Sequence, residues 1–121
     1  MRVFKNKWFV RFADKEGITD DELKEMVNQL EEGQPDANLG GGVYKMRVAR
    51  SGEGKSGGYR VLVFFRSGER TFFRYGFSKS DIGNMSKKEI KIMKSQAKAF
   101  FAQSNDHLQK QLANGTLLEI I

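Results

Sequence analysis

Apolar residues recur at helical spacing in two well-bounded parts of the chain. Within residues 18–33 they form one stripe, made of Leu23, Met26, Val27 and Leu30. Thr19 and Glu22 form a capping box just before this stripe, and Gly33 followed by Pro35 ends it. The pattern predicts a helix whose apolar side packs on a core and whose acidic side faces water.

A second capping box, Ser86 with Glu89, introduces the other stripe, which consists of Ile90, Met93, Ala97, Phe100 and Phe101. Lysines cover the opposite side of this predicted helix, and a last short helix is expected over 105–113, ended by Asn114-Gly115. Residues 7–16 fit a strand and a helix about equally. Asn6 as a cap and Gly17 as a stop favour the helix.

Alternating patterns predict strands over 43–50, 59–66 and 70–77, with the last two joined by a tight hairpin at 67–69. The middle run is apolar on both faces, so we expect it in the interior of a sheet. We further expect a short edge strand at 2–5, a flexible connection at 39–42, and a tail over 116–121 that adds a strand or packs on the core. Together these elements predict one α+β domain over 1–121, a small antiparallel sheet packed against N-terminal and C-terminal helices.

Charge is distributed unevenly along the 121 residues. Residues 1–42 carry a net charge of −3, residues 43–74 carry +6 and residues 75–121 carry +3, which gives the total of +6. A concentrated basic region attracts polyanions, most often nucleic acid, although a solvated surface is the plainer interpretation. The chain contains no cysteine and no long apolar run. We therefore expect no disulfide framework, no signal peptide, no membrane partner, and a cytoplasmic location.

Several kinds of chemistry are poorly supported by the residues. The triplet Gly54-Lys55-Ser56 lacks the upstream glycine of a phosphate-binding loop and precedes a strand, so we interpret 51–58 as a mobile basic hairpin loop whose Lys55 can touch a phosphate backbone. His107 is the single histidine, which excludes a two-histidine acid–base pair and favours an ordinary surface residue. No metal set can be assembled, and we expect neither metal nor cofactor.

A basic cluster on the predicted sheet is the remaining candidate site. Lys45 and Arg47 leave the same face of one strand, and Arg60 begins the next. Lys79, at the exit of the third strand, belongs to the same cluster. Further candidates for contact with RNA or the ribosome are Arg50, Lys55, Tyr59, Arg74, Tyr75, Lys87, Lys91 and Lys94. Such a cluster can hold a phosphate, stack on a base and stabilise charge during cleavage. Without further information a phosphate-binding face lacking chemistry is favoured, because no general base stands out.

The segments YKMRV, GEGKSGGYR and YGFSKSD, together with the leading WFVRFADKEG, resemble the RelE/HigB superfamily of toxins over nearly the whole chain. The resemblance implies a compact α+β fold that cuts mRNA in the ribosomal A site, using the ribose 2′-oxygen and leaving a cyclic phosphate. Carried over by motif, the catalytic set consists of Lys45, Arg47, Arg60 and Lys79, in which Arg60 holds the scissile phosphate. It also implies a cognate antitoxin, often a helix-turn-helix protein in the HigB branch.

Two departures from RelE concern this site. The stretch 81–86 has no tyrosine to stack on a base, and Arg47 replaces a lysine, which leaves Lys45 as the better candidate for the base because arginine stays protonated. Two alternatives remain open. One is a ParE-like toxin that shares the fold and inhibits DNA gyrase, and the other is a basic RNA-binding module without catalysis.

Overall fold

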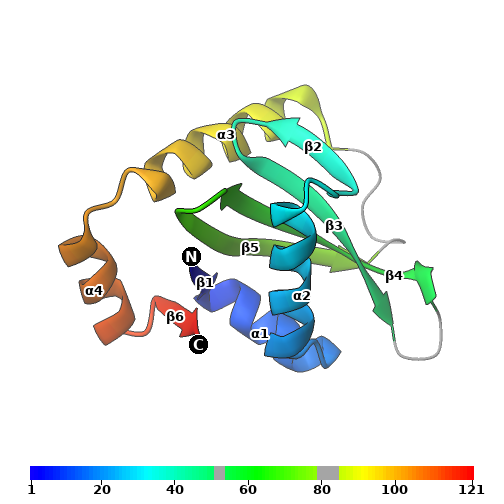
Figure 1. Cartoon of the computed structure of the whole chain (residues 1–121), viewed down its shortest axis with the longest axis horizontal. Coiled ribbons are helices and arrows are strands. Elements are labelled where there is room, and N and C mark those ends of the chain that lie inside the picture. Colours follow the sequence, from blue (N-terminus) through cyan, green and yellow to red (C-terminus); the bar gives the residue numbers. More distant parts are fainter. Residues whose placement is uncertain (51–53, 79–84) are drawn as a thin grey trace.

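A computed structural model describes residues 1–50, 54–78 and 85–121 (Figure 1). The elements in chain order are β1 (Arg2–Asn6), α1 (Lys7–Glu16), α2 (Asp20–Glu31), β2 (Ala37–Gly40), β3 (Val43–Arg50), β4 (Gly54–Arg66), β5 (Arg70–Ser78), α3 (Lys87–Phe101), α4 (Asn105–Ala113) and β6 (Leu117–Ile120). The α+β class is confirmed. Within the described ranges, no helix has the length and apolar character needed to cross a membrane.

The strands form one six-stranded sheet in the order β2-β3-β4-β5-β1-β6. All neighbours run antiparallel except β1 and β5, which are parallel. The expectation of an edge strand at 2–5 is wrong, because β6 pairs along the outer side of β1, with Val3 opposite Ile120. The C-terminal tail therefore forms strand β6, which is one edge of the sheet. Strand β2 is the other edge.

The expected flexible connection at 39–42 is also wrong, because Leu39 and Gly40 belong to strand β2 and only Gly41 and Gly42 form a turn. Gly41 and Gly42 have φ values of 62° and 82°, in the left-handed region that glycine adopts without strain. A Cβ on Gly42 would lie 2.8 Å from Cε2 of Phe101. The glycines therefore let α3 approach the β2–β3 edge closely.

Side chains on the two faces of the sheet enter two separate cores. The face toward α1 and α2 buries Val61, Val63 and Phe65 of β4. The face toward α3 and α4 buries Leu62 and Phe64 of the same strand. Strand β4 is therefore apolar on both sides and interior, as predicted. The acidic helix α2 and the lysine-rich helix α3 consequently cover opposite faces.

Local signals place the helix starts as expected. The Asn6 side chain accepts a hydrogen bond from the Phe9 N–H, which confirms a helix rather than a strand after Lys7. Ser86 and Glu89 form the complete reciprocal capping box of α3. The capping box predicted at α2 forms only in part: Thr19 accepts from the Glu22 N–H at 3.2 Å, but the Glu22 carboxylate accepts from the Thr19 hydroxyl at 3.3 Å and not from the Thr19 N–H.

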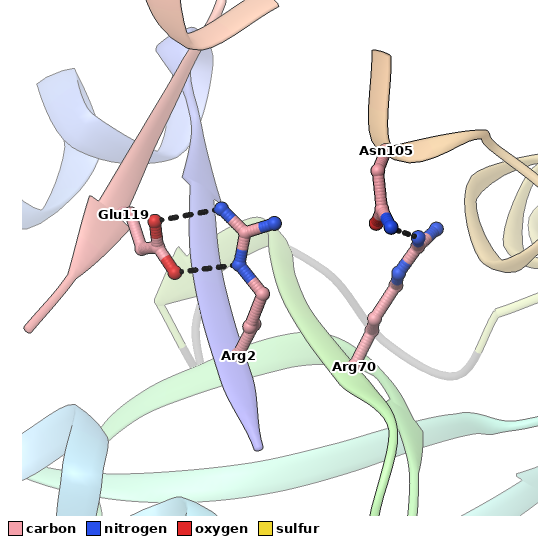
Figure 2. Close-up of polar contacts among 4 residues, drawn as sticks. All are labelled: Arg2, Arg70, Asn105 and Glu119. Atoms are coloured by element: carbon pink, nitrogen blue, oxygen red, sulfur yellow. Dashed lines mark hydrogen bonds and ion pairs between the residues drawn. The ribbon is translucent and has the colours of Figure 1, made fainter. Parts of the chain in front are cut away.

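Two side-chain contacts tie the C-terminal part of the chain to the sheet (Figure 2). Arg2 donates from Nε and Nη2 to the two carboxylate oxygens of Glu119, each at 2.9 Å. Arg70 Nη2 donates to the Asn105 side chain at 3.1 Å. The hydrogen bonds from Arg2 hold the pKa of Glu119 below its ordinary value, outweighing the opposing effect of desolvation.

Candidate functional site

The basic strand residues lie on the sheet face that α3 and α4 cover. Val43 of β3 is buried in that core, so Lys45 and Arg47 project from the same side. The strand register sets Lys45 opposite Leu62 and Arg47 opposite Arg60. Lys45, Arg47 and Arg60 together are called the basic face below.

Arg60 lies on β4, which runs between β3 and β5, and is central on this face. Its cross-strand neighbours are Arg47 on β3 and Phe77 on β5. Its side chain is half-buried, and within the described part of the chain its buried Nη1 atom has no hydrogen-bond partner. A buried donor without a partner costs about 1–3 kcal/mol or more when charged.

The two arginines are also unfavourably placed relative to each other. Directly opposed residues on antiparallel strands have Cβ atoms about 5 Å apart, and like charges there destabilise the sheet. An anion held between Arg47 and Arg60 would relieve this repulsion and supply the missing acceptor for Nη1. Both features therefore favour a phosphate ligand.

A bulge in β5 brings Arg74 and Tyr75 to the same side. Leu62 pairs with Tyr75 and the next residue of β4 pairs with Phe73, which leaves Arg74 without an opposite residue. The Arg74 Nε donates to Oε1 of Gln96 on α3 at 3.1 Å. Tyr75 is half-buried among the apolar residues beneath α3.

Sequence reasoning missed Trp8, which stacks on Tyr75 with ring centroids 4.2 Å apart and planes 15° from parallel. Trp8 is 41% exposed, although it is a large aromatic residue. The available signal was an aromatic ring in the first turn of a polar helix. Its contact with Tyr75, however, depends on how α1 lies along β5.

A cavity of about 180 Å³ lies beneath the first turns of α3. The sheet contributes Leu62, Tyr75 and Phe77 to its wall, and α3 contributes Glu89 and Ile92. Phe77 lies opposite Arg60 on β5, and Leu62 lies two residues further along β4. The cavity therefore adjoins the basic face. Sequence reasoning recognised Glu89 only as a helix cap.

Tyr59 lies apart from the other candidates. It is buried on the opposite face, where its ring meets Phe12 edge-on and its hydroxyl donates to the carboxylate of Glu16. Consecutive strand residues point to opposite faces, so Tyr59 and Arg60 cannot share one surface. Tyr59 supports α1 rather than the basic face.

The lysine side of α3 is exposed at Lys87, Lys91 and Lys94. Lys94 differs from the other two, because a Cβ at Gly40 or Gly41 would come within 3.1 Å of its side chain. Its stem therefore packs on the β2–β3 connection. Lys87 and Lys91 are the better candidates for contacts with a partner.

Other predicted positions fall partly or wholly outside the described residues. Lys79 lies outside them, and the side chains of Arg50 and Lys55 do as well, although their backbones belong to β3 and β4. The interpretation of 51–58 as a loop is corrected in part, since β4 already begins at Gly54. His107 is exposed on α4, and the described residues contain no cluster of three His, Cys, Asp or Glu side chains suited to a metal.

The fold and the basic face together define a small α+β protein with clustered basic side chains on one face of its sheet. The chain belongs to the RelE toxin family, since residues 1–120 match the family described as the RelE toxin of the RelE/RelB toxin–antitoxin system. It is therefore a toxin of such a system, and toxins of this family pair with an antitoxin. No curated protein matches the chain.

Proposed function

We propose that this toxin is a metal-independent endoribonuclease that cuts mRNA on the ribosome and so inhibits translation. The observation that carries the proposal is the pair Arg47 and Arg60, opposed across β3 and β4, with a buried Arg60 Nη1 that has no hydrogen-bond partner among the described residues. This arrangement lowers the stability of the free protein and suits a bound phosphate. An unfavourable feature kept at one place in a fold is typical of a functional site.

The chemistry follows from the side chains on the basic face. The ribose 2′-oxygen attacks the neighbouring phosphorus while its proton leaves to a base, and the bond from phosphorus to the 5′-oxygen breaks. The products are a 2′,3′-cyclic phosphate and a 5′-hydroxyl that takes up a proton. Arg60 and Arg47 offset the charge that grows on the phosphate oxygens. Lys45 is the side chain on this face that can exchange a proton, because arginine stays protonated.

The ribosome supplies what the basic face lacks. The described residues include no pair of histidines for fast proton transfer, so the rate depends on how well the 2′-oxygen is positioned. A ribosome holds mRNA in a fixed conformation, and the exposed Lys87 and Lys91 favour contact with ribosomal RNA phosphates. Naked RNA should accordingly be cut slowly.

Replacing Arg60 tests the proposal directly. Arg60→Ala should lower mRNA cleavage about 100-fold to 1,000-fold, the usual cost of losing one charge stabiliser. Arg60→Lys should recover only part of the rate, since lysine keeps the charge but not the forked donors. Arg66→Ala is the matched control. Arg66 ends the same strand, is exposed and lies over Phe101 outside the basic face, so cleavage should stay near the wild-type rate.

Stability separates a functional role of Arg60 from a structural one. Arg60→Met removes a half-buried charge whose Nη1 has no partner in the described part of the chain, so the melting temperature should stay level or rise while cleavage is lost. A less stable Arg60→Met protein would show that the guanidinium holds the fold together. Broken chromosomal DNA with intact mRNA after induction would instead favour the gyrase-inhibitor alternative.

A further inference from the structure

The cavity beneath α3 is placed to receive a group attached to the phosphate that Arg60 would hold. Arg60 lies directly opposite Phe77 and two residues along β4 from Leu62, and both of these residues line the cavity. Directly opposed side chains are about 5 Å apart at Cβ. One nucleotide can therefore place its phosphate at Arg60 and its base in the cavity.

The sheet wall of the cavity suits a flat ring. Tyr75 and Phe77 contribute neighbouring aromatic side chains, with ring centroids 6.3 Å apart. Trp8 stacks on Tyr75 at 4.2 Å and so fixes the plane of its ring. Stacking of a base on an aromatic side chain is a common way to hold unpaired RNA, and each stacked base typically contributes about 1–3 kcal/mol.

Among the residues that the structure describes, Glu89 is the charged side chain on the wall of this otherwise apolar cavity, and it is exposed to solvent. One of its oxygens, Oε1, accepts the Ser86 N–H at 3.2 Å as part of the capping box. That cap fixes the carboxylate in position and leaves Oε2 for a ligand. A carboxylate accepts hydrogen bonds and repels phosphate, so a ligand group that fits beside it is a donor-bearing base rather than a phosphate.

We propose that this cavity is a guanine-binding subsite, with Glu89 as the residue that selects the base. Guanine presents two adjacent donors, N1–H and the N2 amino group; one matches Oε2, and the other matches the second lone pair of Oε1, which also accepts the Ser86 N–H. The other bases present shorter or mismatched donor sets at that edge. The proposal rests on the proposed nuclease function for its biological role, but binding of a free nucleotide tests it independently.

Titration of the intact protein with the four 3′-mononucleotides is the first test. Guanosine 3′-monophosphate should bind more tightly than the adenosine, cytidine and uridine nucleotides. Glu89→Gln should remove this preference and weaken guanosine binding about tenfold to 100-fold, because a hydrogen-bonded charge is lost. Glutamine still accepts the Ser86 N–H, so the capping box and the melting temperature should be retained.

Closing the cavity is the second test. Ile92 is 45% exposed on α3 and borders the cavity, so Ile92→Trp should fill its mouth and weaken guanosine 3′-monophosphate binding while the protein stays folded. Ser95→Trp is the matched control. It adds the same ring at an exposed position of the same helix that does not line the cavity, and binding should be unchanged.

Mapping of mRNA ends after induction connects the subsite to cleavage. Wild-type cleavage should concentrate beside guanine, and Glu89→Gln should spread the cuts over all bases. Cuts without base preference, or four nucleotides bound equally and unaffected by Glu89→Gln, would overturn the guanine subsite and leave the nuclease proposal intact. Guanosine binding that depends on Glu89, in a protein that cleaves no mRNA, would keep the subsite and refute the nuclease.

Discussion

Among the described glycines, Gly76 leaves the least room for a side chain, so a single methyl group there should be costly. It pairs with Val61 on the face covered by α1, where a Cβ would stand 2.2 Å from Cε2 and 2.5 Å from Cδ2 of Phe12. The Phe12 ring cannot easily yield, because the rings of Trp8, Phe9 and Tyr59 lie 5.5–5.9 Å from it. Gly76→Ala therefore forces α1 away from β5.

The expected cost comes from two opposing effects. Overpacking a filled core costs about 1–3 kcal/mol, and the confined ring places this site near the upper end. Alanine in place of glycine raises the free energy of unfolding by about 0.5–1 kcal/mol, because glycine loses more backbone freedom on folding. The net loss should be about 2 kcal/mol. With an m-value of about 2 kcal/mol/M, the midpoint of urea unfolding should fall by about 1 M.

A double-mutant cycle with Phe12→Ala tests whether the Phe12 ring causes this loss of stability. Once the ring is gone, Gly76→Ala meets no obstacle and should raise stability by about 0.5 kcal/mol, so the sign of its effect reverses. Phe12 is only partly buried, so its own loss should cost about 3 kcal/mol and leave the protein folded. If Gly76→Ala lowers the unfolding midpoint equally in both backgrounds, the contact with Phe12 is not what requires glycine.

Two further predictions concern charge. The pKa of Glu119 is lowered by Arg2 from its ordinary 4.5, so the pair stabilises the fold above that pH and the benefit is lost as pH falls through the lower folded-state pKa. Glu119→Gln should therefore cost about 0.5 kcal/mol in urea unfolding at pH 7, since the pair is partly exposed, and progressively less as pH falls below 4.5; a loss that does not change with pH would refute the linkage. Replacing Lys87 and Lys91 by Glu should weaken ribosome binding and flatten its salt dependence, whereas Lys24→Glu on α2 should change neither.

Features set by neighbouring residues were predictable from the sequence. The capping side chains of Asn6 and Ser86 mark helix starts because they act on N–H groups three residues away. The hairpin at 67–69 also depends only on local conformation, with Gly68 at φ 71° and the Glu69 N–H bonded to the Arg66 carbonyl. Alternation along β3 likewise placed Lys45 and Arg47 together.

Features set by distant pairing were not predictable in the same way. Strand β1 is interior because it pairs with β5 and with β6, segments more than 60 residues away, and nothing in the short run at 2–5 indicates either partner. The opposition of Arg47 and Arg60 likewise depends on the register between β3 and β4. The separation of Tyr59 from the basic face, by contrast, follows from the sequence alone. Tyr59 and Arg60 are adjacent on a strand, so alternation alone separates them.

The position of Tyr75 shows most clearly why a candidate site can escape sequence reasoning. Regular alternation from Phe72 would place Arg74 on the basic side and Tyr75 on the opposite side, with Phe73. The bulge at Arg74 adds one residue and reverses the alternation, so Tyr75 and Phe77 share the face of Phe72. The same reversal turns Gly76 toward Phe12. One extra residue in β5 thus aligns the aromatic wall of the cavity with Arg60 and creates the place where α1 needs a glycine.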